Sequence, residues 1–267
     1  MAKISCKGFD WWFYRGGQGP MLVFLHGFPF DRMLFHSSCL PLIDAYSVLI
    51  PDLPGFGESS FFSEDAPTQF TMDAYADGLA CLFSDLRIEK AVLCGLSMGG
   101  YIAMQFFRRY PQLLSGLVFC DTRSIPDSRE TVKKRLDLAD TAYQIGTATL
   151  AESMIPKLLS TNSQRYRENE RFLFDMIARQ RPSGIAAAAR GMALRDDSTP
   201  YLSEISVPTL VVGGEDDQIS PPEAMTELAS RIPGSELVLI KNAGHLPPLE
   251  NPIAFENKVR CFADRIY

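Results

Sequence analysis

The sequence predicts an α/β protein with a mainly parallel central sheet, helices on both faces and an inserted block of helices. Short apolar runs rich in β-branched residues alternate with longer segments of helical period, as in strands joined by helical crossovers. The alternation stops between about residues 124 and 201, where no convincing strand is found. A chain of 267 residues fits one large domain, or one domain with a sizeable insertion.

The expected elements follow in order along the chain. The strands are expected at Asp10–Tyr14, Met21–Leu25, Tyr46–Ile50, Ala91–Cys94, Gly116–Cys120, Val207–Val212 and Glu236–Ile240. The helices between them are expected at Thr71–Leu86, Met98–Tyr110, Pro222–Ile232 and Pro252–Phe262. The first helix has an apolar stripe at i, i+3, i+4 spacing, and the last two open on prolines, which suit a first helical turn.

The strand-free block contains helical stripes of its own, one of them formed by Val132, Leu136, Ala139 and Tyr143. We expect these helices to form a cap over the carboxyl edge of the sheet, where open α/β sheets bind ligands. The alternative is an ordinary packed subdomain. The expected division is residues 1–123 for the first part of the core, 124–201 for the helical cap and 202–267 for the second part of the core.

Composition excludes several classes of protein. The 26 Lys and Arg residues are outnumbered by 32 Asp and Glu, and no basic stripe is present, so nucleic-acid binding is not expected. No apolar run approaches the roughly 18 residues of a membrane span, and Met1–Gly8 lacks the apolar stretch of a signal peptide. The six cysteines are scattered without a C-x-x-C pair, which favours a reducing, cytoplasmic location, although sequence alone does not exclude bridges. The sequence indicates no oligomeric state.

A G-x-S-x-G motif at Gly95–Gly99 lies between an apolar run and a helical segment. In this context the serine is expected on a sharp strand-to-helix turn that exposes its hydroxyl, with glycines beside it because the turn folds back on itself. The N-terminus of the following helix offers free N–H groups and the positive end of the helix dipole, which favour a developing oxyanion. We therefore predict that Ser97 is a nucleophile.

A serine hydroxyl needs a base to take its proton, and the sequence has only three histidines, His26, His36 and His245. His245 follows an apolar run and is flanked by Gly244 and Pro247, as in a loop at the sheet edge. It is therefore the expected base. His26 stands at a strand end and is assigned to the oxyanion loop, and His36 is expected to be structural.

The histidine in turn needs an acid that fixes its tautomer. Asp217 follows the strand Val207–Val212 and gives the chain order serine, acid, histidine. Asp216 is adjacent, but neighbours on an extended loop point in opposite directions, so only one of the two can face His245. Asp121, after the strand Gly116–Cys120, is the main alternative. No partner ligands accompany the acidic residues, so no metal is expected.

The predicted site also needs two N–H donors for the carbonyl oxygen, and the backbone groups of Phe28 and Met98 are the candidates. Few charges can be placed near the site, which favours an apolar acyl group. Arg123 is the exception, unless it forms an outward salt bridge. The candidate pocket residues, for which core packing is the alternative, are Phe28, Phe30, Met154 and Met192.

Together these motifs resemble the α/β-hydrolase fold superfamily over nearly the whole chain. The residues that carry the resemblance are His26-Gly27, the D-x-x-G-x-G-x-S run Asp52–Ser59, the turn around Ser97, Asp217 before Pro221, and Gly244-His245. The chain is similar to small bacterial carboxylesterases and enol-lactonases that carry a helical cap. The resemblance implies hydrolysis of a carbonyl ester without a cofactor, with Ser97 as nucleophile, His245 as base and Asp217 as acid. It also implies Phe28 and Met98 as oxyanion donors.

The predicted function is therefore a serine hydrolase that cleaves a small carboxylic ester or lactone through an acyl-enzyme. The substrate does not follow, because the same motifs also serve C–C hydrolases, iminopeptidases and cofactor-free perhydrolases. A non-catalytic ligand receptor of the same fold is the alternative from another class.

Overall fold

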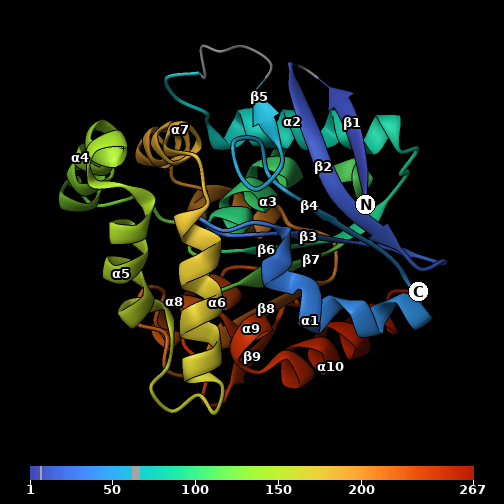
Figure 1. The fold of residues 1–267 in the computed structure, drawn as a ribbon. Coiled ribbons are helices and arrows are strands. Elements are labelled where there is room, and N and C mark those ends of the chain that lie inside the picture. Colours follow the sequence, from blue (N-terminus) through green and yellow to red (C-terminus); the bar gives the residue numbers. More distant parts are fainter. Residues whose placement is uncertain (7, 62–66) are drawn as a thin grey trace.

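The strands form one mixed sheet in a computed structural model that describes residues 1–6, 8–61 and 67–267 (Figure 1). The strand order is β1-β2-β4-β3-β6-β7-β8-β9, and β5 pairs with β2. Pairing is antiparallel from β1 to β4 and parallel from β4 to β9. The strands are β1 Ala2–Cys6, β2 Phe9–Gly16, β3 Met21–Leu25, β4 Ser47–Pro51, β5 Ser60–Phe61, β6 Ala91–Leu96, β7 Leu114–Cys120, β8 Thr209–Gly214 and β9 Glu236–Ile240.

Helices cover both faces of the sheet, which confirms the predicted fold class. Figure 1 shows α2 and α3 on one side and α1 and α10 on the other. The α-helices are α1 His36–Cys39, α2 Met72–Asp85, α3 Met98–Arg109, α4 Arg129–Ile145, α5 Thr147–Leu158, α6 Tyr166–Ala178, α7 Pro182–Ala193, α8 Pro222–Ser230, α9 Pro247–Glu250 and α10 Pro252–Ala263. Short 3₁₀ helices lie at Arg32–Phe35, Leu40–Asp44, Pro111–Leu113 and Thr199–Glu204.

The central strands are short and almost entirely apolar because both of their faces are buried. Every residue of β3, β4, β6 and β8 is buried. On one face, Phe24 of β3 packs on Phe35, which packs in turn on Phe255 of α10. On the other face, Phe83 of α2 packs on Phe106 of α3. Because the strands from β4 to β9 pair in parallel, their carboxyl ends lie at one edge of the sheet.

Helix boundaries follow local capping chemistry. Thr71 caps α2 by accepting the Ala74 N–H, and Ser128 caps α4 in the same way through the Thr131 N–H. Asn251 caps α10, whose first residue is Pro252. The first and last of these helices begin within a residue of the positions that the sequence predicts.

Between β7 and β8, residues 121–208 form α4 to α7 and one 3₁₀ helix but no strand. Figure 1 shows these helices gathered at one end of the molecule. The buried Asp31 carboxylate of the core accepts hydrogen bonds from Arg179 and Gln180, at the end of α6. A Cβ on Gly184 of α7 would lie 1.9 Å from the Gly55 carbonyl oxygen, so α7 packs directly on a core loop.

Some elements were not expected from the sequence. Strand β1 has only Cys6 buried, so its apolar pattern is weak. Helices α1 and α9 are single turns, too short for a helical period to show in the sequence. The expected strand Val207–Val212 begins two residues late, at Thr209. No helix within the described residues is both long and apolar enough to cross a bilayer.

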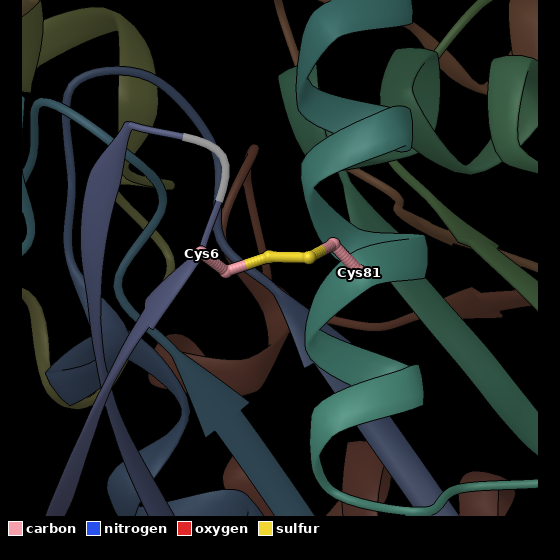
Figure 2. The surroundings of a disulfide bond; sticks show 2 residues. All are labelled: Cys6 and Cys81. Atoms are coloured by element: carbon pink, nitrogen blue, oxygen red, sulfur yellow. A yellow bond between two sulfur atoms is a disulfide. The ribbon is translucent and has the colours of Figure 1, made fainter.

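A disulfide joins Cys6 of β1 to Cys81 of α2, across 75 residues of sequence (Figure 2). The sequence did not identify this pair. Disulfides persist mainly in oxidising compartments, so the bond does not favour the cytoplasmic location that the cysteine pattern suggests. The other four cysteines are free.

We predict that Cys81→Ser lowers the free energy of unfolding by about 2–4 kcal/mol, because the bond restricts a long loop in the unfolded chain. Urea denaturation of the variant and of the unreduced protein measures this difference. Cys261→Ser, at an exposed free cysteine, is the control and should change stability little. Equal stability of oxidised protein and Cys81→Ser would contradict the prediction.

Candidate active site

Ser97 stands on the sharp turn between β6 and α3, with φ 52° and ψ −111°. This left-handed conformation is strained for a residue with a side chain. The turn is so tight that a Cβ on Gly95 would lie 2.2 Å from the Gly99 carbonyl oxygen, and a Cβ on Gly99 would lie 2.3 Å from the Leu25 carbonyl oxygen. The motif glycines are therefore required by close backbone approach, and the Ser97 side chain is left half-buried.

The neighbouring strand β7 holds the strained turn in place. The Ser97 N–H donates to the Cys120 carbonyl oxygen at 2.9 Å, and the Thr122 hydroxyl donates to the Ser97 carbonyl oxygen at 2.8 Å. The Thr122 side chain also packs against Gly100, where a Cβ would come within 2.5 Å of its Oγ1. The residue between these two anchors is Asp121, so Ser97 and Asp121 lie at the same part of the sheet edge.

His245 and Asp217 form a buried pair at the same edge, in the loops after β9 and β8. Nδ1 of His245 is 2.8 Å from Oδ2 of Asp217. The other carboxylate oxygen of Asp217 accepts the Ile219 N–H at 2.7 Å. Burial raises the pKa of Asp217, but the charge of His245 and the hydrogen bonds outweigh it and lower this pKa overall. An ionised Asp217 fixes the proton of His245 on Nδ1, so Nε2 is the basic nitrogen.

Asp121 joins this pair from the end of β7. Its Oδ1 accepts the Gly214 N–H at 2.9 Å, and the Cys120 thiol donates to its Oδ2. Burial raises the pKa of Asp121 well above its usual range, and the charge of Asp217 raises it further. Asp121 and Asp217 share a side-chain hydrogen bond, and the raised pKa of Asp121 beside the lowered pKa of Asp217 favours Asp121 as its donor. The sequence indicates Asp121 only as an alternative acid and carries no signal for this supporting position.

We predict that Asp121→Asn retains kcat within about threefold, because a neutral amide can both donate to Asp217 and accept from Gly214. Asp121→Ala leaves the buried Gly214 N–H without an acceptor and should lower the free energy of unfolding by about 1–3 kcal/mol. Steady-state kinetics and urea denaturation measure the two effects. A severe loss of kcat in Asp121→Asn would mean that Asp121 acts as an ionised acid, contrary to this prediction.

Asp216, the neighbour of Asp217, is directed elsewhere. Its Oδ2 accepts hydrogen bonds from the Ser160 hydroxyl and the Asn162 side chain, both in the segment after α5. Its own N–H donates to the Ala243 carbonyl oxygen. The structure therefore places Asp217 against His245 and Asp216 against the helical block.

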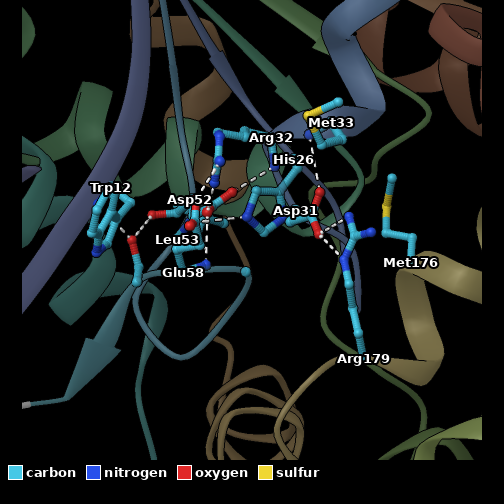
Figure 3. Close-up of polar contacts among 12 residues, drawn as sticks. Trp12, His26, Asp31, Arg32, Met33, Asp52, Leu53, Glu58, Met176 and Arg179 are labelled. Atoms are coloured by element: carbon cyan, nitrogen blue, oxygen red, sulfur yellow. Dashed lines mark hydrogen bonds and ion pairs between the residues drawn. The ribbon is translucent and has the colours of Figure 1, made fainter. Parts of the chain in front are cut away.

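His26 occupies a wholly buried position under the loop that follows β3 (Figure 3). Its Nε2 accepts the Leu53 N–H, and Nδ1, which must then carry the proton, donates to the Gly27 carbonyl oxygen; both distances are 2.9 Å. Burial lowers the pKa of His26 to about 4, so it stays neutral. It is a structural support for the Gly27–Phe28 peptide. His36 is exposed on α1.

The loop Asp52–Ser59 is held together by hydrogen bonds from Glu58 and Ser59 back to Asp52, its first residue. The Asp52 carboxylate accepts the N–H groups of Arg32 and Glu58 at 2.8 and 2.9 Å and pairs with the Arg32 guanidinium (Figure 3). Burial raises the pKa of Asp52 to about 6, with a further contribution from the charge of Asp31. This part of the D-x-x-G-x-G-x-S motif is thus a folded structural loop.

The two candidate oxyanion donors lie beside Ser97. A Cβ on Gly27 would be 3.2 Å from the Ser97 Cβ, so the Gly27–Phe28 backbone runs next to the serine. The Phe28 N–H makes no hydrogen bond within residues 1–6, 8–61 and 67–267. Met98 opens α3, where an N–H has no partner inside the helix. Phe28 is half-buried and Met98 is fully buried.

The candidate pocket residues differ in exposure. Phe30 is fully buried. Met192 is 2% exposed, and its sulfur accepts a hydrogen bond from the Arg135 guanidinium. Phe28 and Met154 are half-buried, and the Phe28 ring meets Phe56 edge-on.

Arg123 lies just beyond the end of β7 and is half-buried. Its Nε is buried without a hydrogen bond, and no ion pair involves it in the described part of the chain. The structure thus offers no outward salt bridge for this residue.

Asp121, Asp217 and His245 bring donor atoms within 4.8 Å of one another, a spacing that a metal ion could also use. These atoms are already engaged by each other and by backbone N–H groups. The donors therefore fit a hydrogen-bonded acid–histidine cluster, and we assign no metal to it.

Residues 20–252 match the family model of the alpha/beta hydrolase fold, and the chain belongs to this family. A thermophilic esterase from Thermogutta terrifontis, solved with malate bound, is 41% identical and superposes with a TM-score of 0.94 over 99% of this chain and 98% of that chain. The enol-lactonase of Burkholderia xenovorans LB400 shares the fold, with a TM-score of 0.89, 24% identity, and coverage of 98% of this chain and 100% of that chain. The pimeloyl-[acyl-carrier protein] methyl ester esterase of Aeromonas hydrophila subsp. hydrophila is 28% identical over 257 residues, which cover 93% of this chain and 97% of that protein.

Proposed function

We propose that the protein is a serine hydrolase that cleaves a small carboxylic ester or lactone through an acyl-enzyme. The observation that carries this proposal is the strained, half-buried Ser97 at the sheet edge that also holds the buried His245–Asp217 pair. The family and the esterases among its relatives support carboxylic ester hydrolysis as the class of reaction.

In the proposed reaction, Ser97 Oγ attacks the substrate carbonyl carbon while Nε2 of His245 takes the hydroxyl proton. The carbonyl oxygen becomes an oxyanion, which the N–H groups of Phe28 and Met98 bind. The tetrahedral intermediate collapses, the C–O bond to the alcohol breaks, and His245 returns the proton to the leaving oxygen. Water then attacks the acyl-enzyme with His245 as base and releases the acid and Ser97. Asp217 stabilises the imidazolium in both halves.

We further propose that residues 124–201 form a cap that selects the substrate. The cap would cover a core built from residues 1–123 and 202–267. Support comes from the position of α4 to α7 after β7, since the loops at the carboxyl ends of parallel strands carry ligand sites in this class of sheet. The candidate acyl-pocket residues are Phe28, Phe30, Met154 and Met192.

Covalent labelling separates this proposal from its alternatives. A fluorophosphonate should label Ser97 in one equivalent, which peptide mass spectrometry locates, and p-nitrophenyl acetate should be turned over many times per site. Labelling without multiple turnover of any substrate would favour a ligand receptor of the same fold. Absence of both labelling and turnover would contradict the proposal.

A substrate panel then tests the reaction class. It should contain short and long acyl esters, lactones, a vinylogous diketone for C–C hydrolysis, and hydrogen peroxide with acetate for perhydrolysis. Esters with and without a free carboxylate belong in the panel, because Arg123 is a half-buried cation without an ion pair. A higher kcat/KM for the diketone or for peroxide than for every ester would contradict ester hydrolysis as the main activity.

A further inference from the structure

The carboxylate of Glu250 connects three separate segments next to His245. Glu250 ends α9, five residues after the histidine, and is 5% exposed. Its Oε1 accepts the Gly244 N–H at 2.7 Å and the Leu246 N–H at 3.3 Å, the two residues that flank His245. Its Oε2 accepts the Ser160 N–H at 2.7 Å, in the segment after α5. One side chain thus holds both neighbours of the histidine and a residue of the helical block.

The segment after α5 also touches the histidine loop directly. The His245 N–H donates to the carbonyl oxygen of Leu158, the last residue of α5, at 2.8 Å. A Cβ on Gly244 would lie 2.8 Å from both the Leu158 oxygen and the Ser160 nitrogen. The backbone of residues 244–246 is therefore enclosed between the end of α5 and the Glu250 carboxylate.

From these contacts we infer that Glu250 is a positioning residue that fixes the His245 backbone and couples it to the end of α5. The inference rests on the proposed function, because Glu250 affects the rate of ester hydrolysis only if His245 is the base in that reaction. Positioning of this kind matters, since small misplacements of a catalytic group can lower a rate by about a hundredfold.

Only a carboxylate can accept hydrogen bonds from all three of these backbone N–H groups through both of its oxygens. Both of its oxygens accept, whereas glutamine has one acceptor oxygen and would direct its NH₂ group at the N–H of Ser160 or Gly244. Burial raises the pKa of Glu250 to about 7, and the charge of Asp217 raises it too, while the three N–H donors oppose this shift. Other charged groups around it are Asp216, which binds Ser160, and Arg165, which donates to the Leu249 carbonyl oxygen and pairs with Glu168.

The test compares Glu250→Gln with the matched variant Glu256→Gln. Glu256 is a largely buried glutamate on α10 that pairs with Arg260. For a p-nitrophenyl ester, with active sites counted by burst titration at pH 8, Glu250→Gln should lower kcat about 10- to 100-fold and change KM less than about twofold. The second-order rate of Ser97 labelling by a fluorophosphonate should fall by the same factor. Glu256→Gln should change none of these quantities by more than about twofold.

Glu250→Asp keeps the charge but shortens the side chain, so it cannot reach Ser160 and Gly244 together. It should also lower kcat at unchanged KM, and it serves as the test if Glu250→Gln does not fold. The inference is overturned if the titrated sites of either variant turn over at the wild-type rate, because Glu250 then supports only the folded state. Failure of the wild-type protein to label at Ser97 would instead reject the proposed function, so the two failures are distinguishable.

Discussion

Replacing Ser97 with alanine is expected to lower kcat for ester hydrolysis at least about a thousandfold. The substitution removes the only atom that we propose attacks the substrate. It leaves the Phe28 and Met98 N–H groups and the His245–Asp217 pair in place. Residual activity from these groups keeps the rate above that in water, whereas KM should change little because binding contacts remain. Steady-state hydrolysis of a p-nitrophenyl ester measures the effect.

The matched control is Ser84→Ala, at an exposed serine near the end of α2. It should leave kcat and KM unchanged. Ser97→Ala should also lose fluorophosphonate labelling while its circular dichroism spectrum stays that of the wild type. Near-normal turnover by Ser97→Ala, with the variant folded, would reject Ser97 as the nucleophile.

The second large effect is expected from Asp217→Asn, which should lower kcat by about 10⁴-fold. Asparagine is nearly the same size, but its amide cannot hold the proton on Nδ1 of His245 or stabilise the imidazolium. Asp217 Oδ2 is 2.8 Å from His245 Nδ1, so the substitution removes a negative charge that is in direct contact with the histidine ring. Asp121 then faces a neutral neighbour, so its pKa should fall, since the charge of Asp217 no longer raises it.

Asp216→Asn is the adjacent control for the same chemical change. Its carboxylate binds Ser160 and Asn162, so this variant should keep kcat within about threefold of the wild type. Both variants are compared by kcat and KM for one ester at pH 8. The opposite ranking, a severe loss in Asp216→Asn and a mild loss in Asp217→Asn, would move the acid to Asp216.

Much of the fold was readable because buried parallel strands leave a strong signal. The run at Met21–Leu25 is apolar throughout, and the structure forms β3 over the same residues. Strand β1 left no such signal, because four of its five residues are at least partly exposed at the sheet edge. Single-turn helices such as α9 lack the length at which a helical period becomes visible.

The candidate site was readable only where local backbone chemistry dictates the residue types. The turn at Ser97 requires glycines at fixed positions around the serine, so the turn can be recognised from the sequence. The hydrogen bond from the Ser160 N–H to the Glu250 carboxylate joins residues 90 positions apart, and the contact between Asp121 and Asp217 also joins distant loops. No spacing rule encodes such long-range contacts. Glu250 lies five residues after His245, but its role depends on how α5 ends.

The disulfide between Cys6 and Cys81 has a consequence for association between molecules. β1 is one outer strand of the sheet, and an outer strand exposes unpaired N–H and C=O groups that can pair with another chain. The bond attaches the Cys6 end of this strand to α2, so displacement of the whole strand from β2 becomes less favourable. In the reduced protein that protection is lost, and slow aggregation through the opened sheet edge becomes the expected route of inactivation.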